Sequence, residues 1–448
     1  MKTPIYDFAE SYAKKNPVRF HMPGHKGKSF LGIEKYDITE IPGADTLYSA
    51  DGIISESEDI ASSLFGTAHS FYSTEGSTLV IKAMLALATA GNKNPKIIAG
   101  RGAHKALVYA AALLDADVVW AYPKNAEHLC SCALCASEVE SLLSENVGIS
   151  AVYITSPDYM GNLSDVEGIS RVCRKYGVPL LVDNAHGAYL NFLSPSCHPI
   201  ALGADMCCDS AHKTLPCLTG GAYLHISKNA PKKYLDSARR VLSLFASTSP
   251  SYLILESLDL CNAYLSGGYR EKLSYTVSEI TKVKSKLSDL GFSVLETEPL
   301  KIVIDANEYG YTGYDVAEHL SKNGIEIEFF DCEYLVLMVT PENDASDYER
   351  LTKALMSLPK KTRMPKEKIG IKIDAPKKMS IRDAVFSEHE TLPARQAIGR
   401  VCASPTVSCP PAVPIAVSGE IITEEAVLLF EKYQIKEIEV VKNDQQEI

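Results

Sequence analysis

Short apolar segments recur through the first half of the chain, and within each the apolar residues are continuous rather than alternating with polar ones. They are KIIA (96–99), DVVWA (117–121), ISAVYIT (149–155), VPLLVD (178–183) and GAYLHI (221–226). Continuous runs rich in β-branched residues are typical of strands covered on both faces, as in parallel sheets. Helix-like stretches lie between them, at 77–90, 104–114, 136–146 and 165–176. The alternation predicts an α/β fold with a mostly parallel sheet.

The pattern changes on either side of this region. Residues 1–50 contain many Pro and Gly, which predicts an arm without long regular elements. Residues 268–290 have the spacing of one long, polar-faced helix that ends at Gly291. We therefore expect an N-terminal arm at 1–50, a large domain at 51–265, a bridging helix at 266–290, a small α+β domain at 291–358, and a linker with a C-terminal domain at 359–448.

Composition limits the functions open to the chain. With 448 residues, 46% of them apolar, it can bury substantial cores in two or three domains. Its 45 Lys+Arg against 56 Asp+Glu give a formal charge of −11, which argues against a nucleic-acid footprint or a cationic membrane-binding face. No apolar run reaches the ~20 residues that span a bilayer, and the first residues lack the apolar core of a secretory signal. We expect a cytoplasmic protein that binds small molecules, not nucleic acid or a membrane.

The stretch DSAHKTLP at 209–216 carries the strongest chemical signal. Lys213 follows an apolar run and has Ser210 and His212 beside it. An amine held on a turn directly after a strand can form a Schiff base with pyridoxal phosphate (PLP). A lone lysine is more often an exposed surface residue, so other parts of a cofactor site must support this interpretation.

Two further segments supply those parts. Asp183 ends the apolar run VPLLVD, where α/β sheets place ligand-binding groups, and its carboxylate would keep a pyridine nitrogen protonated. The segment 73–78 opens a helix-like stretch, so backbone N–H groups and hydroxyls converge at a helix N-terminus, which suits a phosphate. The alternative interpretations are a turn-capping Asp and ordinary Ser/Thr helix capping.

In this order, these residues resemble the bacterial Orn/Lys/Arg (basic amino acid) decarboxylases. The resemblance covers nearly the whole chain and includes FHMPGHK (20–26), DITEIPG (37–43), STSPSY (247–252), AIGR (397–400), Pro410-Pro411 and Gly419-Glu420. It implies the PLP-dependent, aspartate-aminotransferase-like fold (fold type I), with a large domain on a mostly parallel sheet, a smaller α+β domain and a C-terminal domain. The chain begins at the arm, so it resembles the short class without an N-terminal receiver-like domain. We expect a homodimer with active sites shared between subunits.

The resemblance also implies a role for each site residue. Lys213 would be the Schiff-base lysine, Asp183 the partner of the pyridine nitrogen, and His104 a ring stacked on the cofactor. Lys213 or His212 would donate the proton to Cα. The cofactor-binding set would be Gly76, Ser77, Thr78, His104, Asp183, Ala185, His186, Ser210, His212 and Lys213, with Ser247 reaching the phosphate from a second subunit.

The implied activity is decarboxylation of arginine, lysine or ornithine to agmatine, cadaverine or putrescine with release of CO2, and the sequence does not choose among the three. Two alternatives stay open: another PLP reaction, such as an aminotransferase or a lyase, and a non-catalytic relative that binds PLP or a polyamine. They are motivated by departures from the family pattern at Glu75 in the phosphate loop, Asn184 after Asp183, Ala211 before His212, and Cys409 before the Pro pair.

Two other patterns favour ordinary interpretations. His128, Cys130, Cys132 and Cys135 are spaced like zinc ligands, but they follow DVVWA on what we interpret as a variable surface connection. We predict no metal there, and thiols throughout, because 12 cysteines are too few for a disulfide scaffold in a chain of this length. The acidic group Glu56, Glu58 and Asp59 is interpreted as the solvated start of a helix.

Overall fold

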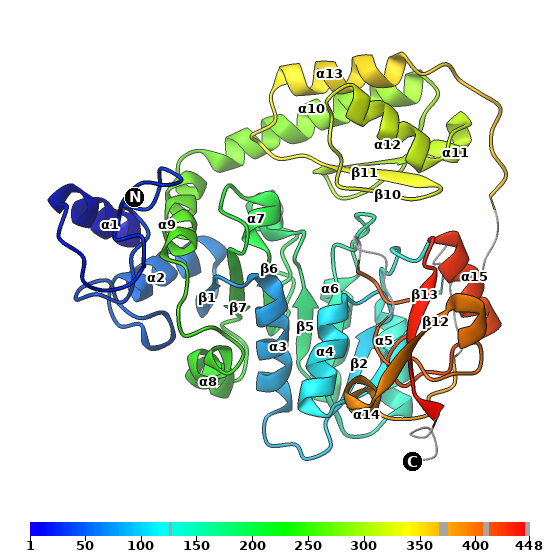
Figure 1. Ribbon diagram of the computed structural model, residues 1–448, viewed down its shortest axis with the longest axis horizontal. Helices are drawn as coiled ribbons and strands as arrows, with labels where there is room; N and C mark the ends of the chain where they lie inside the picture. Colours follow the sequence, from blue (N-terminus) through cyan, green and yellow to red (C-terminus); the bar gives the residue numbers. More distant parts are fainter. Residues whose placement is uncertain (125–127, 367–374, 406–411, 444–448) are drawn as a thin grey trace. The chain divides into compact units, whose positions relative to one another are not determined.

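The computed structural model describes residues 1–124, 128–366, 375–405 and 412–443. The chain divides into two compact units: unit 1 comprises Met1–Gly91 and Val166–Lys272, and unit 2 comprises Asn92–Asp165 and Leu273–Ile448. Each unit has its own strands and helices, and the labels in Figure 1 follow them along the chain. Within these residues, no helix is long and apolar enough to cross a membrane.

The strands of unit 1 lie in the order β1-β7-β6-β5. Their bounds are β1 (His69–Ser73), β5 (Leu180–Asp183), β6 (Met206–Asp209) and β7 (Ala222–Ile226). β7 is antiparallel to β1 and β6, whereas β5 and β6 are parallel. β1, β5 and β6 therefore run in the same direction, and their carboxyl ends lie along one edge of the sheet. All four strands are almost fully buried, as continuous apolar runs predict.

The helices of unit 1 cover this sheet, with α3 packed against β1, β6 and β7 and α6 against β5. They are α1 (Pro4–Lys15), η1 (Leu47–Ser49), α2 (Ile53–Phe65), α3 (Gly76–Thr89), α6 (Val166–Tyr176), η2 (Ala188–Phe192), α7 (Ala211–Thr214), α8 (Lys232–Ser243) and α9 (Tyr252–Ser266). Helix α10 (Tyr269–Asp289) begins in unit 1 and continues into unit 2, matching the predicted long helix.

The arm was predicted to lack long regular elements, and this prediction is wrong. Its first part is α1, a helix of 12 residues with Pro4 in its first turn, where a missing N–H costs little. Asp259 of α9 accepts hydrogen bonds from the N–H groups of Ile5 and Tyr6 at 2.9 and 3.0 Å. These bonds satisfy donors that a helix N-terminus otherwise leaves unpaired. The helix is therefore stabilised by a residue distant in sequence, which a local pattern does not reveal.

Unit 2 contributes the parallel strands β2 (Lys96–Gly100), β3 (Asp117–Ala121) and β4 (Ile149–Thr155), in the order β4-β2-β3. Helices α4 (Lys105–Leu114) and α5 (Ala136–Glu145) occupy the predicted stretches between them. An antiparallel sheet in the order β10-β11-β9-β8 forms the predicted small α+β region. Its elements are β8 (Ser293–Val294), β9 (Lys301–Asp305), α11 (Ala306–Tyr309), α12 (Gly313–Lys322), β10 (Phe329–Phe330), β11 (Tyr334–Met338) and α13 (Ala345–Met356).

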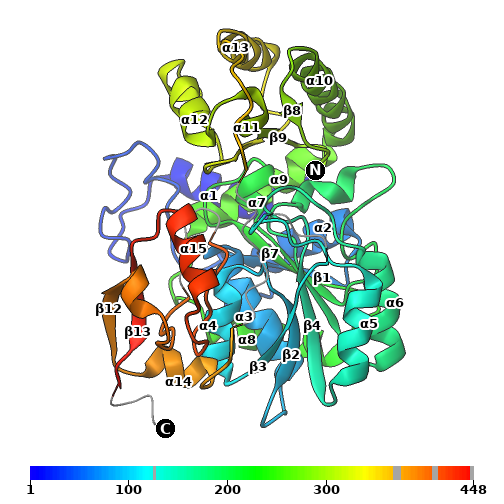
Figure 2. The same cartoon turned by 90° about the vertical axis from the view of Figure 1, so that its right-hand side faces the viewer.

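The last part of the chain was predicted only as a linker with a C-terminal domain, and the structure adds its elements. Besides α14 (Ile381–Phe386), η3 (Ala394–Ala397) and α15 (Glu424–Lys432), it contains an antiparallel pair, β12 (His389–Pro393) with β13 (Glu437–Val441) (Figure 2). β12 alternates partly buried and exposed residues, and its partner is distant in sequence. Phe430, Ile438 and Val440 join Val303 of β9 in one buried apolar cluster.

Candidate active site

The predicted site residues of unit 1 lie at the edge where β1, β5 and β6 end. β6 ends at Asp209, and the chain continues through Ser210 into α7, which bears Lys213. β5 ends at Asp183, and β1 leads through a short loop into α3. Because parallel strands present their carboxyl ends on one side, three segments distant in sequence reach the same edge, where α/β sheets bind ligands.

Side-chain contacts join these segments. The Oγ of Ser210 donates a hydrogen bond to the Oγ of Ser77 at 2.8 Å, so β6 and the start of α3 meet. The Nζ of Lys213 lies 3.0 Å from the Nε2 of His186, which joins α7 to the turn after β5. Lys213 is half-buried, and His186 is buried. The structure thus brings together four of the residues that the resemblance implied for one site.

The loop before α3 has the features of an anion site. Gly76 has φ of 69°, in the left-handed region that favours glycine, and a Cβ placed there would meet nothing within 4 Å. Helix α3 has 14 residues, and its first turn carries the half-buried Ser77 and the exposed Thr78. Open space, two hydroxyls and a helix N-terminus are the donor set that a phosphate needs, so these residues fit the phosphate of PLP.

Asp183 is buried, with 3% of its surface exposed. Its Oδ1 accepts hydrogen bonds from the N–H of Ala185 at 3.2 Å and from the Sγ of Cys208 at 3.4 Å. Burial raises the pKa of the Cys208 thiol well above its usual value, and the charge of Asp183 adds to the effect. A buried carboxylate pairs strongly with a positive charge, as its predicted role at a pyridinium nitrogen requires.

His212 is held by the start of β7. Its backbone N–H donates to the carbonyl oxygen of Gly221 at 3.2 Å, and its Nδ1 lies 2.9 Å from the same oxygen. A carbonyl only accepts, so Nδ1 carries the proton in this contact. Burial lowers the pKa of His212 below its usual value, and the nearby charge of Lys213 lowers it further. The His212 ring is therefore mainly neutral, and its single N–H, at Nδ1, is engaged in the hydrogen bond to Gly221.

Glu75, a departure from the family pattern, turns toward another loop. Its Oε1 accepts a hydrogen bond from the backbone N–H of Ser247 at 2.7 Å. Ser247 is exposed, and its Oγ accepts from the N–H of Ser249 at 3.1 Å. Ser247 thus lies beside the phosphate loop of its own chain. Its assignment to the site of a second subunit stays a prediction.

His104 belongs to unit 2, where it caps α4 by accepting a hydrogen bond at Nδ1 from the N–H of Ala106, at 3.1 Å. The neighbouring Arg101 donates to the carbonyl oxygens of Pro414 and Ile415, both at 2.8 Å, and is paired with Glu420 at 3.3 Å. These bonds fix the residues before α4 against the C-terminal part of the chain. The stacking role of His104 stays a prediction, and Cys409 lies outside the described residues.

The zinc-like pattern was placed on a surface connection, and that placement is wrong for His128, Cys130 and Cys132, which are buried. The Nε2 of His128 lies 2.6 Å from Asp331 Oδ2, and its Nδ1 accepts from the N–H of Cys130 at 3.1 Å. Both nitrogens of the ring are therefore engaged in hydrogen bonds. Most of the described cysteines are buried, and Cys135 is exposed.

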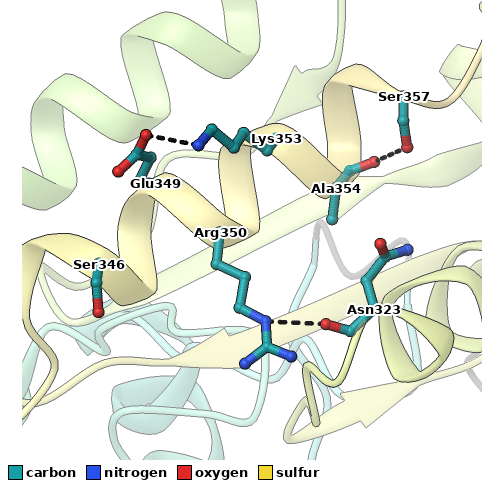
Figure 3. A pocket seen from close by; sticks show the side chains of 7 residues that line it. All are labelled: Asn323, Ser346, Glu349, Arg350, Lys353, Ala354 and Ser357. Carbon is teal, nitrogen blue, oxygen red and sulfur yellow. Dashed lines mark hydrogen bonds and ion pairs between the residues drawn. The ribbon is translucent and has the colours of Figure 1, made fainter.

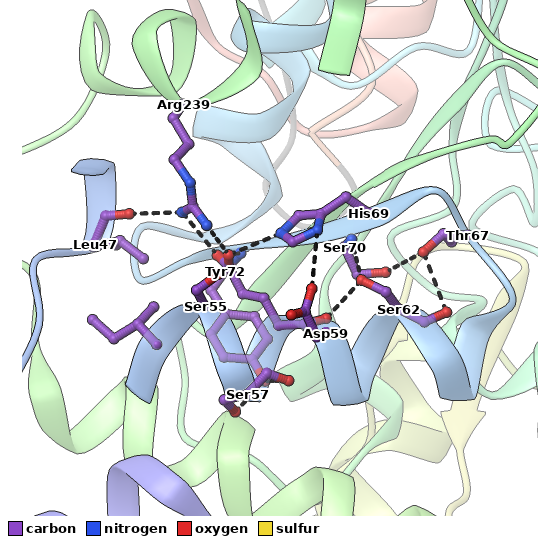
Figure 4. Close-up of polar contacts among 12 residues, drawn as sticks. Leu47, Ser55, Ser57, Asp59, Ser62, Thr67, His69, Ser70, Tyr72 and Arg239 are labelled. Carbon is purple, nitrogen blue, oxygen red and sulfur yellow. Dashed lines mark hydrogen bonds and ion pairs between the residues drawn. The ribbon is translucent and has the colours of Figure 1, made fainter. Parts of the chain in front are cut away.

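The acidic group on α2 was predicted to be solvated, and this is wrong for Glu58, which is fully buried. Its partners Arg239, His69 and Tyr72 are labelled in Figure 4. The Oε2 of Glu58 accepts from Arg239 at 2.5 Å and lies 3.0 Å from the Nε2 of His69, while its Oε1 accepts from the N–H of Tyr72 at 2.9 Å. Glu58 thus joins α2, β1 and α8. Glu56 and Asp59 are exposed, as predicted.

A separate cavity of about 370 Å³ lies in unit 2 between α12 and α13 (Figure 3). Its charged side chains are already engaged: Lys353 pairs with Glu349 at 2.7 Å, and the Nε of Arg350 donates to the carbonyl oxygen of Asn323 at 2.9 Å. None of the residues predicted for the active site lines it. We assign it no part in the chemistry.

Comparison with known proteins identifies the fold and the family. The family described as Orn/Lys/Arg decarboxylase, major domain, matches residues 3–302. The chain belongs to this family. It is 30% identical to the arginine decarboxylase of Halalkalibacterium halodurans over 94% of this chain and 91% of that protein, and 29% identical to that of Bacillus subtilis over 95% and 92%.

The fold is shared with lysine decarboxylase A from Pseudomonas aeruginosa, with a TM-score of 0.82 at 17% identity over 98% of this chain and 80% of that one. The family match confirms the predicted α/β fold of type I and the predicted class, a PLP-dependent amino acid decarboxylase of the Orn/Lys/Arg family. It favours decarboxylation over the two alternatives that the sequence left open.

One residue near the site was missed. Asp209 stands in the quoted stretch 209–216 but received no role, although it is a charged residue that ends an apolar strand. In the structure Asp209 is fully buried and accepts a hydrogen bond from Asn184, the residue after Asp183. A buried charge at the end of a strand was the available signal, because such a group needs partners.

Proposed function

We propose that this family member decarboxylates arginine to agmatine and CO2, with PLP as its cofactor. The two arginine decarboxylases compared above support the choice of arginine, because each matches nearly the full length of the chain. The observation that carries the cofactor is the position of Lys213: its amine stands directly after β6, 3.0 Å from His186, in the same unit as Asp183 and the start of α3.

Three groups of residues would hold the cofactor. Lys213 would bind its aldehyde carbon, Asp183 would pair with its ring nitrogen, and the first turn of α3 with Ser77, Thr78 and Ser210 would bind its phosphate. Bound PLP supplies an electron sink for the electrons left when CO2 departs. The contact of Glu75 with Ser247 supports phosphate binding, because it directs the carboxylate toward an N–H donor.

Lys213 is the better candidate for proton donor to Cα. His212 has a lowered pKa, and its Nδ1–H is directed to Gly221, so the neutral ring has no second proton to donate. Lys213 would hold the cofactor through its amine, and that amine, when not so engaged, would be the group available to carry a proton to Cα. The nearby Nε2 of His186 can orient this amine.

We also propose that the enzyme works as a homodimer in the cytoplasm. The arm exposes large apolar side chains, with Val18 at 83%, Phe20 at 95%, Phe30 at 78% and Leu31 at 85% exposure. Large exposed apolar groups are typical of a protein contact, and a second copy of the chain would cover them. The free cysteines support a reducing compartment.

The test is a product assay with arginine, lysine and ornithine in parallel, with and without added PLP. We expect CO2 and agmatine in equal amounts from arginine, and no product from Lys213→Ala. Cadaverine or putrescine as the main product would show that the substrate is lysine or ornithine instead of arginine. A keto acid without CO2 would overturn the proposal.

A further inference from the structure

A buried polar cluster holds the carboxylate of Asp209 at the end of β6. Its Oδ2 lies 3.0 Å from the Nε2 of His198 and 3.1 Å from the Nε2 of His225, and its Oδ1 accepts from the Nδ2 of Asn184 at 2.6 Å. All four residues have no exposed surface. A carboxylate buried this deeply is tolerated only when donors surround it, and three of them do so here.

An ionised carboxylate only accepts, so the Nε2 of each histidine donates to Asp209. The Nδ1 of His198 faces the N–H of Ile200 at 3.4 Å, so it accepts, and Nε2 is left to donate. The Nδ1 of His225 lies 2.8 Å from the Oγ of Ser70. This Oγ lies 2.8 Å from the Oγ1 of Thr67 (Figure 4). Burial alone would raise the pKa of Asp209. The charge interactions and hydrogen bonds with His198 and His225 have the larger effect and hold the pKa of Asp209 below its usual range. The carboxylate is therefore a fixed acceptor.

Asn184 connects this acceptor to Asp183. β5 and β6 pair with Asp183 opposite Cys208, and the N–H of Asn184 extends the pairing by donating to the carbonyl oxygen of Cys208 at 3.0 Å. Successive residues of a strand point to opposite faces. The Asn184 side chain goes to Asp209, whereas Asp183 contacts the Cys208 thiol. Anchoring Asn184 on one face thus directs the Asp183 carboxylate to the other.

Asn184 also closes the turn that carries His186. The carbonyl oxygen of Asn184 accepts from the N–H of Gly187 at 2.7 Å. A Cβ on Gly187 would lie 2.0 Å from the Oδ1 of Asn184, so the turn is closed tightly around this side chain. His186 lies within the turn, 3.0 Å from Lys213. The position of His186 therefore depends on where Asn184 is held.

We propose that Asn184 and Asp209 are a positioning pair: Asp209, held by two histidines, holds the Asn184 amide. That amide sets the direction of the Asp183 carboxylate and the position of His186 beside Lys213. This inference rests on the proposed function, since the cofactor is what Asp183 and Lys213 would hold. The pair depends on an amide NH2 group that donates a hydrogen bond to a carboxylate oxygen. A carboxylate at position 184 would face Asp209 with no donor between them.

Exchange of the two groups tests the pair directly. In Asn184→Asp the two carboxylates repel. In Asp209→Asn one of the two carboxylate oxygens becomes an NH2 group, so either the histidines or the Asn184 amide lose their acceptor. In the double variant, the amide oxygen at 209 can accept from both histidines while its NH2 donates to the new carboxylate at 184, and the net charge is that of the wild type. We expect each single variant to weaken PLP binding about tenfold or more, and the double variant to recover to within about threefold, as for side chains in direct contact.

The decisive readouts are the PLP dissociation constant and the pH midpoint of the visible absorbance of the bound cofactor. Both should shift in the single variants and return in the double variant. Asn262→Asp is the matched control, because Asn262 is equally buried in unit 1 and its amide donates to Tyr72 at 2.8 Å. This control should lower thermal stability without moving the midpoint. If Asn184→Asp does not fold, Asn184→Ala removes the amide without adding charge and should show the same shift.

Several outcomes would overturn the pair. Single variants that lose thermal stability but keep the wild-type PLP affinity and midpoint would assign the cluster a merely structural role. A double variant whose loss of PLP affinity equals the sum of the two single losses would do the same. One metal ion per chain in the purified protein would replace the hydrogen-bond assignment, since His198, Cys207 and Asp209 offer ligand atoms within 4.8 Å of one another. Wild-type protein that binds no PLP would instead overturn the proposed function.

Discussion

The carboxylate of Glu75 accepts a hydrogen bond from the backbone N–H of Ser247, with 2.7 Å between the two atoms. This contact joins the loop before α3 to the segment before α9 within one chain. It places a negative charge one residue before the glycine that opens the proposed phosphate site. The effect of the Glu75 charge and the cross-subunit role of Ser247 can therefore be tested separately.

Glu75→Gln should tighten PLP binding by a few fold. The amide oxygen can still accept from Ser247, so the loop contact is kept while the negative charge near the phosphate is removed. Because Glu75 is exposed, salt screens the effect, and the difference from wild type should shrink at high ionic strength. Equilibrium binding of PLP at two salt concentrations measures this, and an unchanged affinity at low salt would show that the charge does not reach the phosphate.

Ser247→Asp should weaken PLP retention by like-charge repulsion while the fold survives. Mixed with Lys213→Ala under subunit exchange, it should recover part of the activity, because one site of the mixed dimer then has both native residues if sites are shared. Mass analysis verifies the exchange. No recovery would show that Ser247 serves the site of its own chain, beside Glu75.

Lys213→Ala should abolish turnover and the covalent PLP adduct that borohydride traps, since Lys213 is the lysine of the segment 209–216 that follows β6. Peptide mapping of the trapped wild-type protein should find the label on Lys213. Lys232→Ala, on the exposed start of α8, is the control and should keep both adduct and activity. A trapped adduct at another lysine in the Lys213 variant would remove the assignment.

Asp183→Asn should lower turnover at least about 10²-fold, the scale for losing a key charge in a site that excludes water. PLP should stay partly bound through the phosphate loop, because that contact is independent of the ring nitrogen. Steady-state kinetics at saturating PLP measure the loss. Near-normal kcat would refute the pairing of Asp183 with the ring.

Glu256→Gln should stabilise the protein in alkaline solution. Burial raises the pKa of Glu256 to about 8, and Asp37 and Asp259 add to it. A raised carboxyl pKa means that the native state prefers the protonated form, so wild-type stability is complete below the ordinary pKa and is lost as the pH rises through about 8. The variant mimics the protonated form and should gain more than about 1 kcal/mol over wild type at pH 9 and little at pH 4. Denaturant unfolding at both values tests this, with the exposed Glu271→Gln as control.

Five strands were predictable from the sequence alone, because their signal is local: a strand covered on both faces must be apolar throughout, as 149–155 and 178–183 are. β1 (His69–Ser73) was not among them. The sequence also predicted the residues of a PLP site, since a lysine after one strand, an aspartate after another and a Ser/Thr-rich helix start keep their chemistry wherever the chain brings them. Order along the chain then made the family recognisable.

Only the tertiary structure decided which of these groups meet and which charges are buried. Helix α1 depends on Asp259, 254 positions from Ile5, and Glu58 is buried because Arg239 and His69 reach it from α8 and β1. The Asn184–Asp209 pair spans 25 positions and two strands. Each of these side chains is polar, so hydropathy predicts it to be solvated. What holds it inside is the free energy of hydrogen bonds to partners that the folded chain alone brings within reach.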